Sequence, residues 1–295
     1  MAAGNVFSLV KEAGQEWMAD KAPRLSAATA YYTILSLAPL LMICLSIAGL
    51  VFGRDAARSG IIAQFKTVAG DSGAKAAEEL LKNASHVDSG VISIVIGVIM
   101  LLIGASAVFG ELQDAFNTVW NAPPRPSRGF WGVIKDRFLS FAMVLSVGFL
   151  LLVSMVLSTM LSSMSEFAAG SLPGSSILFR VLELAVSFAV ITSLFAMLFK
   201  YLPDVRVPWR EVWIGAAITA ALFTIGKYLI GLYLGKAAVA TPFGAAGSVV
   251  ALVVWVYYSA MILFFGGELT QALARRNYPE QFAKPNDKPA PIGTY

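Results

Sequence analysis

Long apolar segments alternate with short polar ones along this chain. Four apolar stretches hold no charged residue: they lie between Arg24 and Arg54, Asp88 and Glu111, Arg137 and Glu166, and Lys236 and Glu268. A helix needs about 20 apolar residues to cross the hydrocarbon core of a bilayer, and each stretch supplies them. Two further segments, 177–199 and 212–234, are long enough to span, although the first carries Arg180 and Glu183 and the second Lys227.

The pattern therefore predicts an all-α, polytopic membrane protein. We expect a bundle of six transmembrane helices, at 30–52, 90–110, 138–161, 177–199, 212–234 and 249–267. These spans would form one membrane domain over residues 1–276. The remaining residues, 277–295, are rich in proline and polar side chains, which predicts a disordered tail.

The basic residues favour one orientation of the bundle. With six spans, fourteen Lys and Arg residues fall on the side that holds both termini, and eight fall on the other side. Lys and Arg accumulate in cytoplasmic segments, so both termini are predicted to be cytoplasmic. The segment 53–89 then becomes the only sizeable extracytoplasmic loop. Its apolar residues suggest two short amphipathic helices separated by Gly70–Gly73.

A short helix is predicted before the first span, over residues 5–21. Its apolar residues recur at helical spacing and are Phe7, Val10, Gly14, Trp17 and Met18. One interpretation is an amphipathic helix in the membrane interface. The other is a helix that packs on the protein's own loops, and the sequence does not choose between them.

Composition supports the membrane class and removes several enzyme classes. Hydrophobic residues make up 57% of the chain and charged residues 14%, whereas soluble domains carry about 25% charge. The net charge of +4 is explained by topology, so nucleic acid is not an expected partner. One cysteine, Cys44, and one histidine, His86, leave no zinc-protease ligand set, and we expect no metal or cofactor. A serine-nucleophile elbow and a phosphate-binding loop are also absent from the sequence.

Charged residues inside spans are the first candidates for a functional site, because burying a charge in lipid is costly. Glu183 and Lys227 lie at similar predicted depth, near the outer ends of their spans. They could line or gate a polar cavity open to the outside. Alternatively Glu183 pairs with Arg180, three residues earlier, while Lys227 extends its ammonium group toward the interface.

A second group lies at the predicted cytoplasmic ends of the spans. Its candidate members are Glu111, Asp114, Asn117, Lys200 and Glu268. These side chains could close the cytoplasmic side or line its mouth. They could equally be ordinary residues that hold the helix ends together.

Pro39 lies inside the first span, and proline removes a backbone hydrogen bond. We therefore expect a bend there, with Ser36 one turn earlier and close to the disturbed carbonyl groups.

Three motifs resemble the YihY/BrkB family of bacterial inner-membrane proteins. They are the run from Arg24 to Leu40, the segment from Gly104 to Trp120, and the segment from Phe243 to Leu269. The family often has Tyr where this chain has Phe243. The resemblance implies a six-span protein of the bacterial inner membrane. It also brings a ribonuclease label, which we do not carry over because this chain shows no nuclease site, and labels for virulence and envelope lipid export.

We therefore expect a transporter or lipid-handling protein without an ATPase of its own. Its partners would be membrane lipids and a small solute or lipid substrate. A non-catalytic membrane scaffold is the alternative. The sequence does not indicate the oligomeric state.

Overall fold

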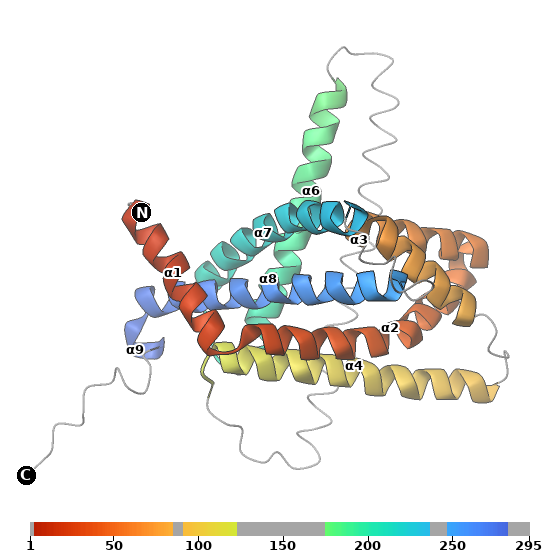
Figure 1. Cartoon of the computed structure of the whole chain (residues 1–295), viewed down its shortest axis with the longest axis horizontal. Coiled ribbons are helices and arrows are strands. Elements are labelled where there is room, and N and C mark those ends of the chain that lie inside the picture. The colour runs from red at the N-terminus through yellow and green to blue at the C-terminus, as the bar shows by residue number, and fades with distance from the viewer. Residues whose placement is uncertain (1–2, 85–90, 123–174, 237–246, 283–295) are drawn as a thin grey trace, which may run out of the picture. The chain divides into compact units, whose positions relative to one another are not determined.

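The computed structural model describes residues 3–84, 91–122, 175–236 and 247–282, and all their secondary structure is helical (Figure 1). The helices are α1 (Ala3–Ala19), α2 (Ala22–Phe52), α3 (Arg54–Ala84), α4 (Val91–Val119), α6 (Ser175–Tyr201), α7 (Trp209–Lys236), α8 (Gly247–Asn277) and α9 (Pro279–Phe282). The predicted span 138–161 lies outside these ranges.

The all-α membrane class is confirmed. Among the described helices, four are long and apolar enough to cross a membrane: Ala22–Met42, Leu184–Tyr201, Trp209–Tyr233 and Gly247–Asn277. The helices also run past the predicted spans, since α4 continues to Val119 and α8 to Asn277. The number of six spans and the orientation of the termini remain predictions. The first residues of the predicted tail form α9, and 283–295 lie outside the described part.

The chain divides into two compact units. The first unit contains α1, the last residues of α4, α6, the beginning of α7, the end of α8 and α9. The second unit contains α2, α3, most of α4, the end of α7 and the first part of α8. Three helices therefore contribute residues to both units.

The core of the second unit joins α3 to α2 and α8. Leu37 and Leu41 of α2 pack with Ala76 and Leu81 of α3 and with Leu252 of α8. The two halves of α3 meet at Gly70, whose φ of 70° lies in the left-handed region that glycine adopts without strain. The predicted loop 53–89 is therefore mostly helix, and its buried apolar residues pack against α2 and α8.

In the first unit, α7 and α8 approach each other closely through two reciprocal pairs. A Cβ atom added to Gly215 of α7 would clash with Thr270 of α8, and one added to Gly266 of α8 would clash with Thr219 of α7. Each glycine precedes the threonine of its own helix by four residues, so two Gly-x-x-x-Thr motifs meet in antiparallel register. Small residues of this kind let helix backbones pack closely in membranes.

Several hydroxyl groups in the apolar helices form hydrogen bonds within their own helix. Thr219 donates to the Gly215 carbonyl at 2.7 Å, and Thr270 donates to the Gly266 carbonyl at 2.7 Å. Ser26 and Thr192 make the same bond to the carbonyl four residues earlier. A polar group without a partner costs several kcal/mol in hydrocarbon, so these local bonds make the hydroxyls compatible with a membrane span.

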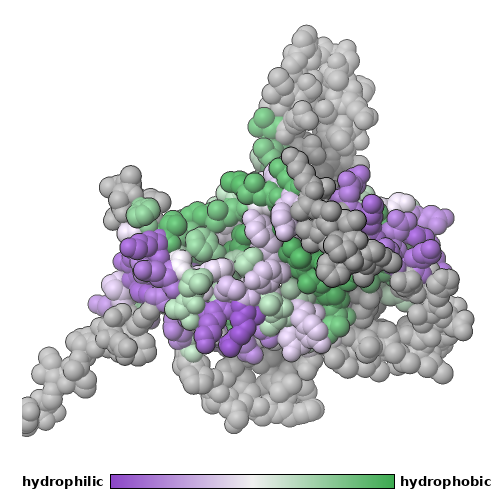
Figure 2. Space-filling model, in the orientation of Figure 1, coloured by the Kyte–Doolittle hydropathy of each residue, from purple (hydrophilic) through white to green (hydrophobic). Residues whose placement is uncertain are grey.

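One face of α7 is apolar and exposed. Leu222, Ile225, Leu229 and Leu232 recur every three or four residues and are 36% to 58% exposed. Figure 2 shows hydrophobic residues gathered along α7 and hydrophilic residues gathered over α3. A continuous apolar stripe on a spanning helix is the surface expected to face lipid.

The close contact of α7 with α8 predicts that Gly215→Ala lowers the thermal stability of the detergent-solubilised protein, because the added Cβ must displace Thr270. The matched control is Gly231→Ala on the same helix, where no atom lies within 4 Å of the added Cβ. Ala favours helix over Gly by up to about 1 kcal/mol, so the control should melt at the same or a higher temperature. Equal melting temperatures for both variants would contradict the close contact.

Candidate functional site

The N-terminal helix α1 packs on the end of α8. Leu9 and Ala13 of α1 are buried against Leu269, Ala272 and Leu273 of α8. Three residues of the predicted apolar face of α1 are exposed, since Phe7 is 74% exposed, Val10 45% and Met18 64%. The other two, Gly14 and Trp17, are half-buried. Helix α1 thus has two distinct faces, one that contacts α8 and one that is apolar and open.

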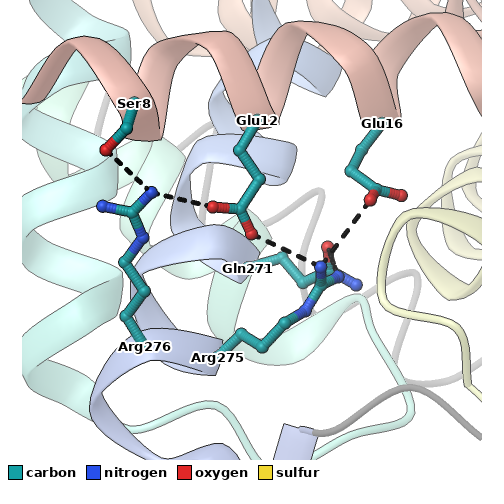
Figure 3. A network of polar contacts seen from close by, with 6 residues as sticks. All are labelled: Ser8, Glu12, Glu16, Gln271, Arg275 and Arg276. Atoms are coloured by element: carbon teal, nitrogen blue, oxygen red, sulfur yellow. Dashed lines mark hydrogen bonds and ion pairs between the residues drawn. The ribbon is translucent and has the colours of Figure 1, made fainter. Parts of the chain in front are cut away.

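A network of charged side chains surrounds this contact (Figure 3). Arg276 Nη2 lies 2.9 Å from Glu12 Oε2 and also donates to Ser8 Oγ at 3.2 Å. Arg275 Nη1 lies 3.5 Å from Glu12 Oε1 and 3.7 Å from Glu16 Oε1. Arg275 also donates to Gln271 Oε1 at 2.9 Å, which orients its guanidinium group.

Glu268 lies beside this network and is buried. Only 1% of the residue is exposed, and within the described part no donor reaches either carboxyl oxygen. The carboxyl groups of Asp20 and Glu16 and the guanidinium of Arg275 act on it electrostatically. A buried carboxyl group among like charges is uncommon unless it has a role, which makes Glu268 the principal site candidate.

Other polar residues of the first unit hold helix ends and a loop in place. Asn117 donates to Asp204 Oδ2 at 2.8 Å and accepts from the Asp204 backbone N–H at 2.9 Å. Lys200 donates to the Val207 carbonyl at 2.6 Å and lies 5.1 Å from the centre of the Trp209 ring. These contacts fix the connection between α6 and α7 and attach it to α4.

Glu211 is a second buried carboxylate of this unit, and its place in the sequence did not mark it as a candidate. It lies in the first turn of α7, where a negative charge is favoured by the helix dipole. Its Oε1 accepts a hydrogen bond from Asn277 Nδ2 at 2.9 Å, which ties the start of α7 to the end of α8.

The remaining candidates lie on α4, α6 and α7. Glu111 and Asp114 belong to the second unit, where burial raises the pKa of Glu111 and the charge of Asp114 raises that pKa further. Lys227 also belongs to the second unit, with Nζ 5.5 Å from the centre of the Tyr228 ring. Arg180 and Glu183 lie on α6, but their side chains fall outside the described residues, so their predicted roles remain predictions.

The predicted bend at Pro39 also remains a prediction. Helix α2 is assigned without interruption from Ala22 to Phe52, so the proline does not end it. Ser36 donates to the Thr33 carbonyl at 3.0 Å, and Thr33 donates to the Thr29 carbonyl at 2.7 Å. A Cβ added to Gly104 would lie 2.9 Å from Ser36 Cβ, so α4 packs closely against α2 at this turn.

Within the described ranges, no three His, Cys, Asp or Glu residues form a group that could hold a metal ion. The groups that this cluster brings together are carboxyl and guanidinium groups, which form ion pairs.

The network predicts that Glu12→Ala loosens α1, because both arginines lose a carboxylate partner. Partly exposed ion pairs contribute about 0.2–1 kcal/mol, so faster amide hydrogen exchange in α1 is expected without global unfolding. A double-mutant cycle with Arg276→Ala should give a coupling free energy in that range.

Lys11→Ala is the matched control for this measurement, since Lys11 is an exposed residue of the same helix. The rate of amide hydrogen exchange in α1 of this variant should equal that of the wild type. Exchange that changes as much in Lys11→Ala as in Glu12→Ala would show that the network does not hold α1.

Comparison with known proteins places the chain in a family. The family model for Virulence factor BrkB matches residues 13–291. A UPF0761 membrane protein of Pseudomonas aeruginosa strain LESB58 is 29% identical over 277 residues, which are 90% of this chain and 64% of that protein. A UPF0761 membrane protein of Azotobacter vinelandii is 30% identical, covering 86% of this chain and 60% of that protein.

A third relative, a UPF0761 membrane protein of Alteromonas mediterranea, is 29% identical over 83% of this chain and 80% of its own length. The chain thus spans less than two thirds of the Pseudomonas and Azotobacter relatives. No solved structure matches it. The match over residues 13–291 covers nearly the whole chain, and this helical membrane protein belongs to the Virulence factor BrkB family.

Proposed function

We propose that this protein is a transporter or lipid-handling protein of the bacterial inner membrane that works without an ATPase of its own. The observation that carries the proposal is Glu268, a buried carboxyl group near the end of the apolar helix α8. An ionisable residue in a spanning helix costs about 2.5–3.5 kcal/mol on insertion scales, and such residues mark transport routes.

The proposal includes a six-span topology with both termini in the cytoplasm. Lys and Arg content supports this orientation, as fourteen of them then lie on the side of the termini. The exposed apolar residues Phe7, Val10 and Met18 support a position of α1 in the membrane interface, since α2 begins three residues after α1 ends. Glu268 would then lie on the cytoplasmic side.

Within this proposal, Glu111, Asn117 and Glu268 act on the cytoplasmic side, together with Asp114 and Lys200. Glu183 and Lys227, with Arg180, act on the outer side. The first span, with Ser36 and Pro39, lines or moves along the route. These roles come from the positions of the residues in the sequence.

A membrane scaffold is the second candidate, and a specific observation favours it. Asn117 and Lys200 use their polar groups to hold helix ends and a loop together. A scaffold needs such fixed contacts and no route for a substrate. We do not propose a nuclease or other enzymatic role, because the sequence contains no catalytic motif that would support it.

Topology is tested with single cysteines in a Cys44→Ser background. We expect cysteines at Ala2 and Thr294 to react with a membrane-impermeant maleimide only after the inner membrane is opened. A cysteine at Ser72, in the segment 53–89, should react in intact spheroplasts. Labelling of position 294 in intact spheroplasts would contradict cytoplasmic termini.

The transport proposal is tested in proteoliposomes that contain a fluorescent phospholipid in both leaflets. Dithionite added outside bleaches only the outer leaflet unless the protein moves lipid, so we expect bleaching to extend to the inner leaflet. Vesicle swelling in small solutes provides a second readout. Absence of both activities would contradict the proposal and favour the scaffold.

In whichever of these two assays shows activity, Lys227→Ala should reduce the transport rate more than Lys236→Ala, because only Lys227 lies well within a predicted span. Both variants remove one ammonium group from α7, so net charge is matched. Equal rates would remove Lys227 from the site while leaving the transport proposal intact.

A further inference from the structure

The connection between α6 and α7 joins two helices that are long and apolar enough to cross a membrane. One apolar segment ends at Tyr201 and the next begins at Trp209. If both helices span the bilayer, the residues from Tyr201 to Trp209 lie at its surface. Tyr and Trp are the residues enriched at this depth, because their rings are apolar on one side and carry a polar group on the other.

Three aromatic side chains at this connection are exposed and two of them touch. Tyr201 is 58% exposed, and Trp209 and Trp213 are each 47% exposed. The Tyr201 and Trp209 rings meet edge to face with centroids 6.2 Å apart, and Lys200 Nζ lies 5.1 Å from the centre of the Trp209 ring. Trp209 is therefore held by two neighbours while much of its ring stays open. A side chain that is already held loses little conformational entropy when it binds a partner.

The backbone of the connection is fixed as well. Leu202 and Val207 are buried, and the Asn117 side chain makes two hydrogen bonds to Asp204. Arg206 lies between these anchored positions and is exposed. The connection thus presents a guanidinium group from an ordered segment.

The positive charge of this segment is not used within the described part of the protein. Arg206 and Arg210 are both exposed, and no carboxylate of the described residues forms an ion pair with either. The neighbouring carboxylates of Asp204 and Glu211 accept hydrogen bonds from asparagine side chains. The two arginines at the end of α8, in contrast, pair with carboxylates of α1.

Arginine is suited to phosphate, because its planar guanidinium group can donate two parallel hydrogen bonds to it. A soluble phosphate compound would satisfy the two arginines but leave both tryptophans in water. A phospholipid satisfies both sets, since its phosphate lies at the level of the arginines and its glycerol and upper acyl chains at the level of the rings.

We propose that the α6–α7 connection is a binding site for an acidic phospholipid. Arg206 and Arg210 bind the phosphate of the headgroup, and Trp209 and Trp213 contact the glycerol and the first part of the acyl chains. The site rests on the proposed topology, in which α6 and α7 span the membrane and this connection is cytoplasmic, but it does not require transport.

The experiment titrates the purified full chain in detergent with phosphatidylglycerol or with phosphatidylcholine of the same acyl chains, and counts bound lipid by native mass spectrometry. We expect phosphatidylglycerol to bind more tightly, and added salt to reduce this preference. Arg206→Gln and Arg210→Gln should each weaken phosphatidylglycerol binding about fivefold and leave phosphatidylcholine binding unchanged. Trp209→Leu should weaken the binding of both lipids.

Arg24→Gln is the matched control, since Arg24 is an exposed arginine at the start of another predicted span on the same predicted side. This variant removes the same charge and should bind phosphatidylglycerol as the wild type does. The melting temperature of each variant without lipid should equal that of the wild type, because all three arginines are exposed.

Fluorescence separates the site from the topology on which it rests. The chain has six tryptophans, so the signal of Trp213 is taken as the difference between the wild type and Trp213→Phe. In bilayers, lipids brominated near the carbonyl end of the acyl chain should quench this signal more than lipids brominated near its methyl end. The reverse order would show that the proposed span is misplaced, and the site would fall with it.

Three results would overturn the lipid site even if the quenching order is as expected. The first is equal affinity for the two lipids. The second is a loss of binding in Arg24→Gln as large as in Arg206→Gln, which would show general attraction to positive charge. The third is binding of soluble glycerol phosphate as tight as that of phosphatidylglycerol, which would identify a soluble phosphate compound as the ligand.

Discussion

The close approach of α7 and α8 is the constraint on which the first unit depends. Gly215 and Gly266 have no side chain to separate the two backbones, and Thr219 and Thr270 fill the space that they leave. The two threonines can enter an apolar contact because their hydroxyl groups bond within their own helices. With one side of α8 taken up by α7, its polar positions Glu268, Gln271 and Arg275 are left for the side where α1 packs.

Apolar packing and charge act together at the contact of α1 with α8. In this apolar cluster, α1 contributes two buried residues, Leu9 and Ala13, which is a small number for a helix of 17 residues. The ion pairs of Glu12 and Glu16 with the arginines, at N···O distances of 2.9–3.7 Å, add directional contacts. Hydrophobic burial thus brings α1 to α8, and the charges determine how it lies there.

Much of the fold follows from the sequence, because spans are long apolar windows without charge. The continuation of helices beyond the predicted spans could not be predicted from hydrophobicity. Helix α4 runs to Val119 and α8 to Asn277 through polar residues, which a search for apolar segments leaves out. The two halves of α3 were predicted as two helices separated by Gly70–Gly73, and the structure has its non-helical backbone conformation at Gly70. The face on which α1 packs was not predicted. The apolar spacing in the sequence runs through Phe7, Val10 and Met18, which are exposed, whereas Leu9 and Ala13 make the contact with α8.

The site was predicted only in part. Glu268 was identified as a charged residue at the end of an apolar stretch, but its neighbours come from α1, which is more than 240 positions away in sequence. A signal was present in the spacing: Glu12, Glu16 and Asp20 repeat every four residues, and Glu268, Gln271 and Arg275 repeat every three or four. An acidic stripe and a polar stripe of matching period indicate helices that can pair, although no periodicity identifies which helix meets which.

The pairing of Arg275 and Arg276 with α1 also changes how this end of the protein meets lipid. Both arginines contribute positive charge during insertion of the chain into a bilayer. In the folded protein, the carboxylates of Glu12 and Glu16 neutralise much of that charge. Attraction to acidic headgroups falls accordingly. In the proposed interfacial position of α1, adhesion of this end to a membrane would depend on apolar contact through Phe7, Val10 and Met18, which salt does not screen.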